Sequence, residues 1–160
     1  MKIILWVKIG EHLMAIDKAK AEEALLRITL EKLATDGLEG IKARDLANEA
    51  SISVGTIYNI FGDLDHLIMR ANCQTYDDLA DKARAELHIA QRNSNDVLDQ
   101  LYCLTEVYIR FIEEHNNRWM SVLNFNRSHG KGLPKWYTSK QYLVFAIIEQ
   151  SLLGLEGIRS

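Results

Sequence analysis

The stretch from Ile41 to Phe61 constrains the fold of this chain more than any other segment. Apolar residues recur at helical spacing up to Ala50, stop at the segment Ser51-Ile52-Ser53, and resume at Ile57. This pattern predicts two short helices joined by a tight turn. One face of the helix pair carries four apolar residues that can be buried against a third helix: Leu46, Ala47, Ile52 and Ile57.

The opposite face of the helix pair has side chains that suit contact with DNA. It combines small residues, hydroxyls, an amide and two cations: Lys42, Arg44, Ser53, Gly55, Thr56, Tyr58 and Asn59. Cations and hydroxyls bind phosphate oxygens, and an amide can bind a phosphate or read an adenine edge. Gly55 lets the backbone approach closely, and Ser53 is positioned to cap the second helix. The same pattern also fits an ordinary helical hairpin with a polar outer face.

A longer segment around this stretch resembles a known family. The run LLRITLEKLATDGLEGIKARDLANEASISVGTIYNIF is similar to the DNA-binding domain of TetR-type transcriptional regulators. The matching residues lie in register without gaps: Leu25, Leu26, Leu33, Ala34, Gly37, Leu38, Arg44, Asp45, Leu46, Ala47, Ala50, Ser53, Gly55, Thr56, Tyr58 and Phe61. The resemblance implies an all-α fold. It implies a DNA-binding domain over residues 11–79, with its helix-turn-helix motif at 42–61, and a helical regulatory and dimerisation domain over 80–160.

The resemblance also implies roles for individual residues. Phosphate contacts are expected from four side chains: Lys42, Arg44, Thr56 and Tyr58. Base edges are expected to face Val54, Gly55 and Asn59. The full expected DNA-binding set is Lys42, Ala43, Arg44, Ser53, Val54, Gly55, Thr56, Tyr58 and Asn59.

Three positions depart from the family pattern. Ser51 replaces the usual glycine, so we expect slight strain in the turn. Lys42 replaces a serine or threonine, so it keeps a phosphate contact but loses the side-chain cap. Leu64 replaces a lysine that many members carry, and one phosphate contact is thereby lost.

The flanking elements of the first half follow from apolar spacing and caps. We expect a disordered or loosely packed arm over residues 1–10 and a long helix over 11–36. A further helix is expected over 65–88, and its amino end is capped by one of two aspartates: Asp63 or Asp65. A polar break follows at 91–96.

The second half of the chain predicts helices over 96–114, 118–125 and 135–153, with a loop at 128–134. Ser94 or Asn95 is expected to cap the first of these helices. That helix has two apolar stripes, one of Val97, Leu101, Leu104, Tyr108 and Phe111, and one of Leu98, Thr105, Ile109 and Ile112. An apolar surface this wide predicts burial on two sides, either as simple core or with one side lining a ligand cavity.

This second half resembles the body of a TetR branch that is marked by a Trp-His-Gly pattern. The residues that carry the resemblance are Trp119, His129, Gly130, Leu133, Pro134, Trp136, Tyr137, Phe145, Ile148 and Glu149. It implies a ligand-sensing and dimer-forming body, shortened relative to the family. The expected ligand-lining residues are Leu104, Tyr108, Trp119, Leu123, His129 and Phe145.

Four apolar residues near the end of the last expected helix need a partner surface: Ile147, Ile148, Leu152 and Leu153. Burying two such residues on each side is worth about 3–6 kcal/mol, so we expect the chain to form a homodimer.

Composition narrows the function classes. The net charge of −3 argues against a generic nucleic-acid binder, whereas a reader of one short site needs only a local cationic patch. Cys73 and Cys103 lie far apart without metal spacing, which indicates a reduced, cytoplasmic protein. The apolar start of the chain is interrupted by Lys8, so it does not fit a signal peptide.

Motifs for catalysis are not found in the sequence. The five histidines have no zinc spacing, no nucleophile motif occurs, and no glycine loop for phosphate is present. His129 is the one residue that could act on a ligand, and a solvated loop histidine is the favoured explanation for it. The sequence therefore predicts a protein that is not an enzyme and needs no metal or cofactor.

The leading hypothesis is a sequence-specific DNA-binding transcriptional regulator. It would act in the cytoplasm as a homodimeric repressor on a double-stranded DNA operator, without a membrane partner, and respond to a small apolar ligand. The alternative is a shortened ligand-binding or interaction protein that does not bind an operator. The net negative charge of the chain and the replacement of a lysine by Leu64 favour this alternative.

Overall fold

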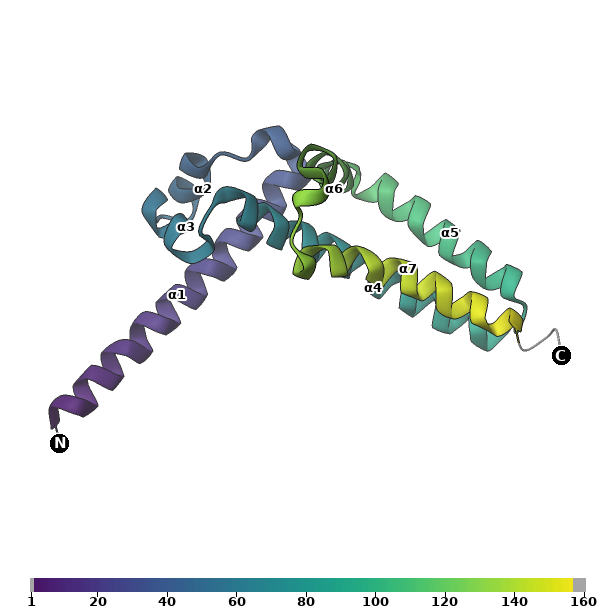
Figure 1. The fold of residues 1–160 in the computed structure, drawn as a ribbon, viewed down its shortest axis with the longest axis horizontal. Coiled ribbons are helices and arrows are strands. Elements are labelled where there is room, and N and C mark those ends of the chain that lie inside the picture. The colour runs from purple at the N-terminus through teal and green to yellow at the C-terminus, as the bar shows by residue number, and fades with distance from the viewer. Residues whose placement is uncertain (1, 157–160) are drawn as a thin grey trace. The chain divides into compact units, whose positions relative to one another are not determined.

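The computed structural model describes residues 2–156 of the chain, with side chains described for residues 17–130 and 132–153. These residues form seven α-helices and two short 3-10 helices, and no strand occurs in this range (Figure 1). The predicted all-α class is therefore confirmed.

The backbone contacts divide the chain into two compact units, Met1–Ala71 and Asn72–Ser160, which we call the head and the body. The division falls inside a single long helix, α4 (Leu64–Asn93). The domain boundary expected from the sequence, between residues 79 and 80, lies in the same helix. Each unit is described on its own below.

The head consists of three helices that pack on one another, followed by the start of α4. Helix α1 (Lys2–Thr35) contacts both α2 (Ala43–Glu49) and α3 (Val54–Phe61), and α2 contacts α3. A short 3-10 helix, η1 (Leu38–Gly40), connects α1 to α2. The buried apolar residues of the head come from all four helices and from the connection between α1 and α2: Leu25, Ile28, Leu33, Ile41, Leu46, Ala47, Ile57, Phe61, Leu67, Ile68 and Ala71. Of the four predicted anchors, Leu46, Ala47 and Ile57 are in this core, and Ile52 is half-buried.

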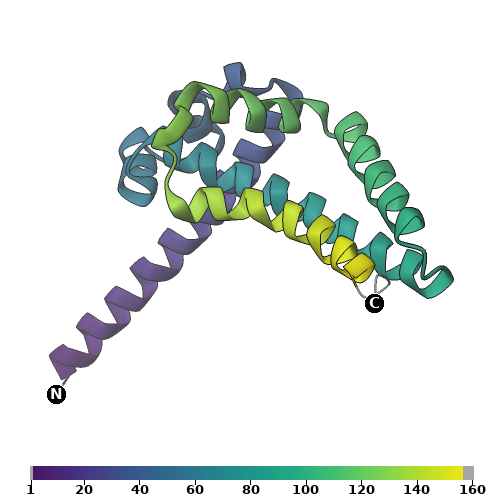
Figure 2. The same ribbon diagram turned by 45° about the vertical axis from the view of Figure 1, so that its right-hand side comes forward.

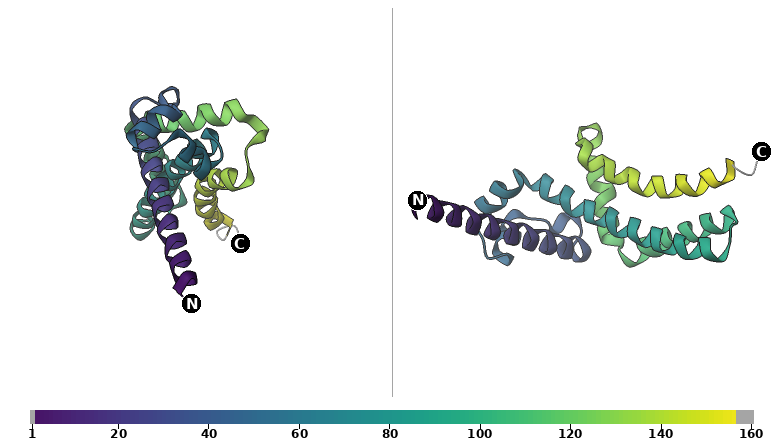
Figure 3. Two further views of the ribbon diagram at one scale, coloured as in Figure 1. Left: turned by 90° about the vertical axis from the view of Figure 1, so that its left-hand side faces the viewer. Right: turned by 90° about the horizontal axis from the view of Figure 1, so that it is seen from below.

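Helix α1 is longer than the sequence predicted. It begins at Lys2, so residues 2–10 are helical and the expectation of a disordered segment is wrong, while Met1 lies outside the described residues. Both views in Figure 3 show α1 as one uninterrupted helix. This segment contains no proline, and its single interior glycine, Gly10, costs only about 1 kcal/mol of helix stability. Gly37 lies just beyond the helix end with φ +68°, a conformation that glycine adopts without strain.

Helix α4 has an aspartate cap at its start, as expected, and it ends later than the sequence predicted. Asp63 caps it, because its carboxylate accepts a hydrogen bond of 2.6 Å from the backbone N–H of His66, and Asp65 lies inside the first turn. The helix continues to Asn93 rather than stopping near residue 88, since no glycine or proline interrupts it. The polar break is accordingly shorter than the predicted segment 91–96.

The cap of the next helix, α5 (Val97–Glu114), is Asp96, and the prediction of Ser94 or Asn95 is wrong. The Asp96 carboxylate accepts a hydrogen bond of 2.9 Å from the Leu98 N–H. The Ser94 hydroxyl accepts a bond of 3.0 Å from the Asp96 N–H and donates one of 2.6 Å to Asp99. Ser94 therefore shapes the turn that places the carboxylate.

The body contains α5, α6 (Asn116–His129), the 3-10 helix η2 (Gly130–Gly132), α7 (Lys135–Glu156) and the remainder of α4. Helix α6 is longer than the predicted 118–125, and η2 shortens the predicted loop. Helix α7 lies along α4, and α5 contacts both α6 and α7 (Figures 1 and 2). One apolar cluster joins α4, α5 and α7: Ala80, Ala83, Leu87, Leu104, Val107 and Ile147.

The second apolar stripe of α5 is not buried in this chain. Leu98 is 60% exposed and Ile109 is 50% exposed, so the prediction of burial on both sides is wrong for the described chain. Helix α5 packs through its first stripe, in which Val97, Leu104 and Phe111 are buried. The other side of the helix has no neighbour among the described residues that would cover it.

Candidate nucleic-acid interface and body cavity

The turn between α2 and α3 is tight, and Ser51 carries its unusual backbone angle. Ser51 has φ +55°, and among the described residues it is the only non-glycine with a positive φ. The backbone N–H of Ile52 closes the turn with a hydrogen bond of 2.9 Å to the carbonyl of Ala47. The strain expected where the family has glycine is therefore present, because a side chain is disfavoured in this conformation.

The start of α3 is capped as predicted. The Ser53 hydroxyl accepts a hydrogen bond of 3.1 Å from the Thr56 N–H, and the two hydroxyl oxygens lie 2.9 Å apart. Lys42 precedes α2 without any side-chain cap, which was also predicted. The hydroxyls of Ser53 and Thr56 thus bond each other, and fewer of their hydrogen-bonding sites remain for a phosphate.

The predicted DNA-binding residues lie together on the α2–α3 pair, and most are accessible. Six of them are exposed: Lys42, Arg44, Ser53, Gly55, Tyr58 and Asn59. Ala43, Val54 and Thr56 are half-buried. Tyr58 keeps 45% of its surface exposed despite its aromatic ring. Because Gly55, Tyr58 and Asn59 are spaced three and four residues apart, they share one face of α3.

The cations of this surface are not neutralised within the described part of the chain. Two other head cations are paired, since Lys32 lies 3.1 Å from Glu49 and Arg70 lies 3.0 Å from Glu22. The hydrogen bond to Glu49 raises the pKa of Lys32. Lys42 and Arg44, in contrast, have no carboxylate within ion-pair distance among the described residues, so their charge remains available to a phosphate.

Gly55 is not required by the fold of the head. A Cβ atom added there would meet only the Ser53 hydroxyl oxygen at 3.6 Å, which is an ordinary contact. An alanine would fit and would favour the helix. Internal packing therefore does not explain a glycine at this exposed position.

The structure adds a feature that the sequence reasoning missed. Asp17, Lys18 and Ala21 of α1 border a shallow hollow of about 340 Å³ beside α3. The α3 side of the hollow includes Thr56 and Asn59. Lys18 thus adds a cation beside the face that carries Asn59, and no sequence signal pointed to it, because only packing of α1 on α3 brings these residues together.

The body contains a cavity of about 550 Å³ between α4, α5, α6 and α7. Its lining is mostly apolar and aromatic: Tyr76, Leu79, Ala83, Leu101, Leu104, Thr105, Tyr108, Trp119, Leu123, Asn126, Gln141, Val144, Phe145, Ile147 and Ile148. Five of the six predicted ligand-lining residues are in this set: Leu104, Tyr108, Trp119, Leu123 and Phe145.

The sixth, His129, does not line the cavity. Its ring stacks on Phe125 with a centroid separation of 4.0 Å, and Nδ1 lies 2.9 Å from the Phe125 carbonyl oxygen. Nδ1 also lies 3.0 Å from the Ser128 hydroxyl. The structure therefore places His129 at the carboxyl end of α6, where it bonds the last turn of the helix rather than the cavity.

A polar network closes one part of the cavity. The Tyr137 hydroxyl donates a bond of 2.8 Å to the Asn126 amide oxygen, and the Asn126 amide nitrogen donates one of 2.9 Å to the Tyr76 hydroxyl. Asn72 donates a longer bond of 3.4 Å to Tyr137. Burial raises the pKa of both Tyr76 and Tyr137, and hydrogen bonds from Asn126 and Gln141 partly offset this rise at Tyr76.

Neither a metal site nor a membrane-spanning helix occurs in the described part of the chain. Among the described residues, no group of three or more His, Cys, Asp or Glu side chains is placed to hold a metal ion, and no helix is both long and apolar enough to cross a membrane. No protein-family model matches the chain, and no curated protein matches it significantly. The function must therefore be argued from the geometry of the two sites.

Proposed function

We propose that the chain is a sequence-specific DNA-binding transcriptional regulator of the TetR type, a cytoplasmic homodimeric repressor that a small apolar ligand releases from its operator. One observation carries the proposal. The α2–α3 pair buries one face in the head and presents Lys42, Arg44, Tyr58 and Asn59 on the other, without ion-pair partners for the cations among the described residues.

In this proposal α3 enters the major groove, and Val54, Gly55 and Asn59 face the base edges. Lys42 and Arg44, at the amino end of α2, bind the phosphates beside the groove, and Tyr58 adds a hydroxyl contact. The missing cation at Leu64, which is half-buried at the start of α4, leaves these contacts as the main source of affinity.

The proposed ligand response depends on α4, because this helix belongs to both the head and the body. Tyr76, Leu79 and Ala83 of α4 line the body cavity. A ligand in the cavity that favours a different position of α4 would change the spacing of the two heads in a dimer. The ligand must bind the released state more tightly, since equal affinity for both states shifts nothing.

The test is fluorescence anisotropy of the protein on DNA from just upstream of its own gene, repeated over a salt series. We expect nanomolar affinity and a steep salt dependence, both lost in the double variant Arg44→Ala/Tyr58→Ala. Arg27→Ala is the matched control, because it removes an arginine from α1 that is paired with Glu31 and lies outside the proposed surface. A monomer whose affinity for this DNA equals its millimolar affinity for random DNA would instead favour a ligand-binding protein without an operator.

A further inference from the structure

We propose that the body cavity binds an uncharged amphipathic molecule, with an apolar body and one hydrogen-bonding oxygen held by Asn126 and Gln141. The inference rests on the proposed function in one respect, because there this molecule is the ligand that releases the regulator from DNA. Its physical basis is the cavity alone, which is formed entirely by residues of the body.

The size and lining of the cavity suit a small apolar molecule. Its volume of about 550 Å³ lies within the range of ligand pockets, roughly 300–1,000 Å³. Trp119 and Tyr108 form an aromatic wall, with ring centroids 5.6 Å apart in an edge-to-face arrangement. The Thr105 hydroxyl bonds the Leu101 carbonyl at 2.8 Å, so this polar atom is satisfied within its own helix.

The two side-chain amides of the lining lie at one end of the cavity. A hydrogen bond of 2.9 Å joins Asn126 to the Tyr76 hydroxyl, and the Gln141 amide is near enough to this hydroxyl to lower its pKa. The helices α4 and α7 lead away from this end to Ala83 and Ile148, where the lining is apolar. Seven residues separate Gln141 from Ile148, which is about 10 Å along a helix. The cavity therefore has a polar end and an apolar end, as an amphipathic molecule requires.

The polar end keeps hydrogen-bonding capacity for a ligand. The Asn126 amide carries two N–H donors, and the bond to Tyr76 uses one of them. Gln141 contributes a second amide that is only partly buried. An amide offers both donors and an acceptor, so a hydroxyl, carbonyl or ether oxygen can be bound there, and a neutral group needs no counter-charge.

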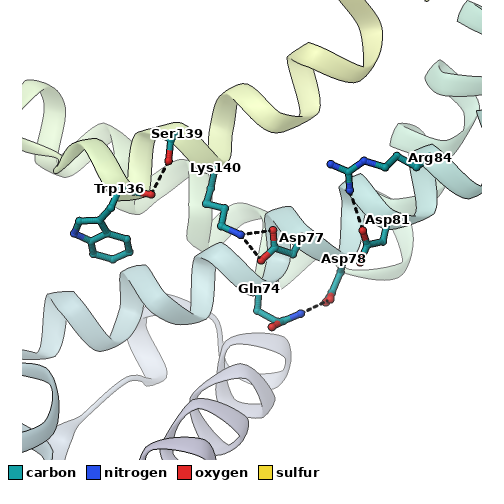
Figure 4. Close-up of polar contacts among 8 residues, drawn as sticks. All are labelled: Gln74, Asp77, Asp78, Asp81, Arg84, Trp136, Ser139 and Lys140. Atoms are coloured by element: carbon teal, nitrogen blue, oxygen red, sulfur yellow. Dashed lines mark hydrogen bonds and ion pairs between the residues drawn. The ribbon is translucent and has the colours of Figure 1, made fainter. Parts of the chain in front are cut away.

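No charged side chain is among the lining residues, and two cations that adjoin lining residues in sequence are paired with carboxylates. Lys140, next to Gln141, binds both carboxylate oxygens of Asp77 at 2.7 Å (Figure 4). Arg118, next to Trp119, binds Asp78 at 2.6 Å. An ionised ligand would therefore lose its hydration without gaining an opposite charge, which is costly in an apolar cavity.

The experiment compares three probes with the same eight-carbon chain: 1-octanol, octanoate and octylammonium. Binding is measured at pH 7 without DNA, in the full chain with Trp6→Phe and Trp136→Phe, so that Trp119 is the only tryptophan. We expect 1-octanol to change the Trp119 emission and to bind more tightly than either ion, by on the order of tenfold or more. Equal or tighter binding of an ion, or no response to any probe, would overturn the inference.

A substitution pair locates the polar end. Gln141→Leu should weaken 1-octanol binding by about threefold to tenfold, the effect of one lost hydrogen bond. Gln74→Leu makes the same change on an exposed part of α4 outside the cavity and should leave binding unchanged. Equal effects of the two substitutions would contradict the assignment.

The two proposals can fail separately. If 1-octanol binds as expected but leaves the operator affinity unchanged, the ligand class is supported and the proposed release from DNA is not. If the head does not bind DNA, the probe series still tests the cavity, because it is carried out without DNA.

Discussion

Ser51 holds the α2–α3 turn in a left-handed backbone conformation, with φ +55°. A residue with a side chain costs about 1–2 kcal/mol in this conformation, and glycine avoids this cost. Glycine also has greater conformational freedom in the unfolded chain, which offsets part of the gain in stability. The turn orients α3 relative to α2, so this one residue bears on both the stability of the head and the presentation of Asn59.

We predict that Ser51→Gly raises the free energy of unfolding by about 0.5–1 kcal/mol, measured by urea denaturation. Ser51→Ala is the control, because it removes the hydroxyl but keeps the Cβ atom and should give no such gain. If both variants were equally stable, the backbone angle would not be the source of the strain.

His115, between α5 and α6, gives the body a pH-dependent stability. Burial lowers its pKa, and the nearby Arg118 and Lys82 lower it further, while Glu114 and Asp78 act in the opposite direction. The folded state therefore prefers the neutral imidazole. The unfolded chain takes up a proton more readily, so the contribution to stability is present above the unfolded pKa of about 6.5 and is lost as the pH falls through the folded pKa.

We predict that thermal stability declines as the pH falls from about 6.5 toward 5, and that His115→Gln reduces this slope. Scanning calorimetry across this range measures the effect. His88→Gln, at an exposed position of α4, is the control and should leave the slope as it is in the unaltered chain. Parallel slopes in all three proteins would exclude His115 as the source.

At the scale of elements, α3 combines two proposed tasks on one short helix. Tyr58 lies one residue before Asn59, and both are exposed. A hydroxyl contact to a phosphate is the same for every sequence, whereas an amide at a base edge distinguishes adenine from other bases. Substitution of Tyr58 should therefore change the affinity for any DNA, whereas substitution of Asn59 should change the preference for a particular sequence.

We predict that Tyr58→Ala weakens binding to specific and random DNA alike, whereas Asn59→Ala lowers the preference for the operator. Discrimination at a single base pair is worth about 1–3 kcal/mol, so the change in preference should be readily measured. Competition binding on both DNAs gives the result. If the two variants behaved identically on both, the separate roles would be wrong.

For the whole molecule, the exposed apolar residues of the body support the proposed homodimer. Tyr102 is 74% exposed and Tyr142 is 70% exposed. Leu98, Ile109, Leu152 and Leu153 are exposed as well. Of the four residues that were expected to need a partner, Ile147 is already buried in the cluster with α4 and α5, and the other three remain accessible.

We predict that the chain sediments as a dimer at micromolar concentration and that Tyr102→Glu/Tyr142→Glu is monomeric, because a buried unpaired carboxylate is costly. The monomeric variant should also bind the operator more weakly, because the two half-sites of the operator are then bound by two independent chains. Met120→Glu, a change of another exposed apolar residue on α6, serves as the control. A dimer that survives the double substitution would place the interface elsewhere.

The strain at Ser51 was expected from the family resemblance, whereas local patterns in the sequence determined the helical class, the Ser53 cap and most of the buried anchors of the head. Each of these depends on residues within about four positions of one another, and apolar spacing or a single side chain is enough to predict them. Helix lengths were less predictable, because α1 and α4 extend through residues that are compatible with a helix but give no clear start or stop signal.

Only the tertiary structure decided which residues meet across helices. Tyr76, Asn126 and Gln141 come from three helices and form the polar end of the cavity, and no pattern in the sequence grouped them. Helix packing also places Lys18 beside α3 and His129 against Phe125. One apolar stripe of α5 is exposed for the same reason. Helical periodicity specifies which face of a helix is apolar, whereas the packing of helices distant in sequence decides what that face meets.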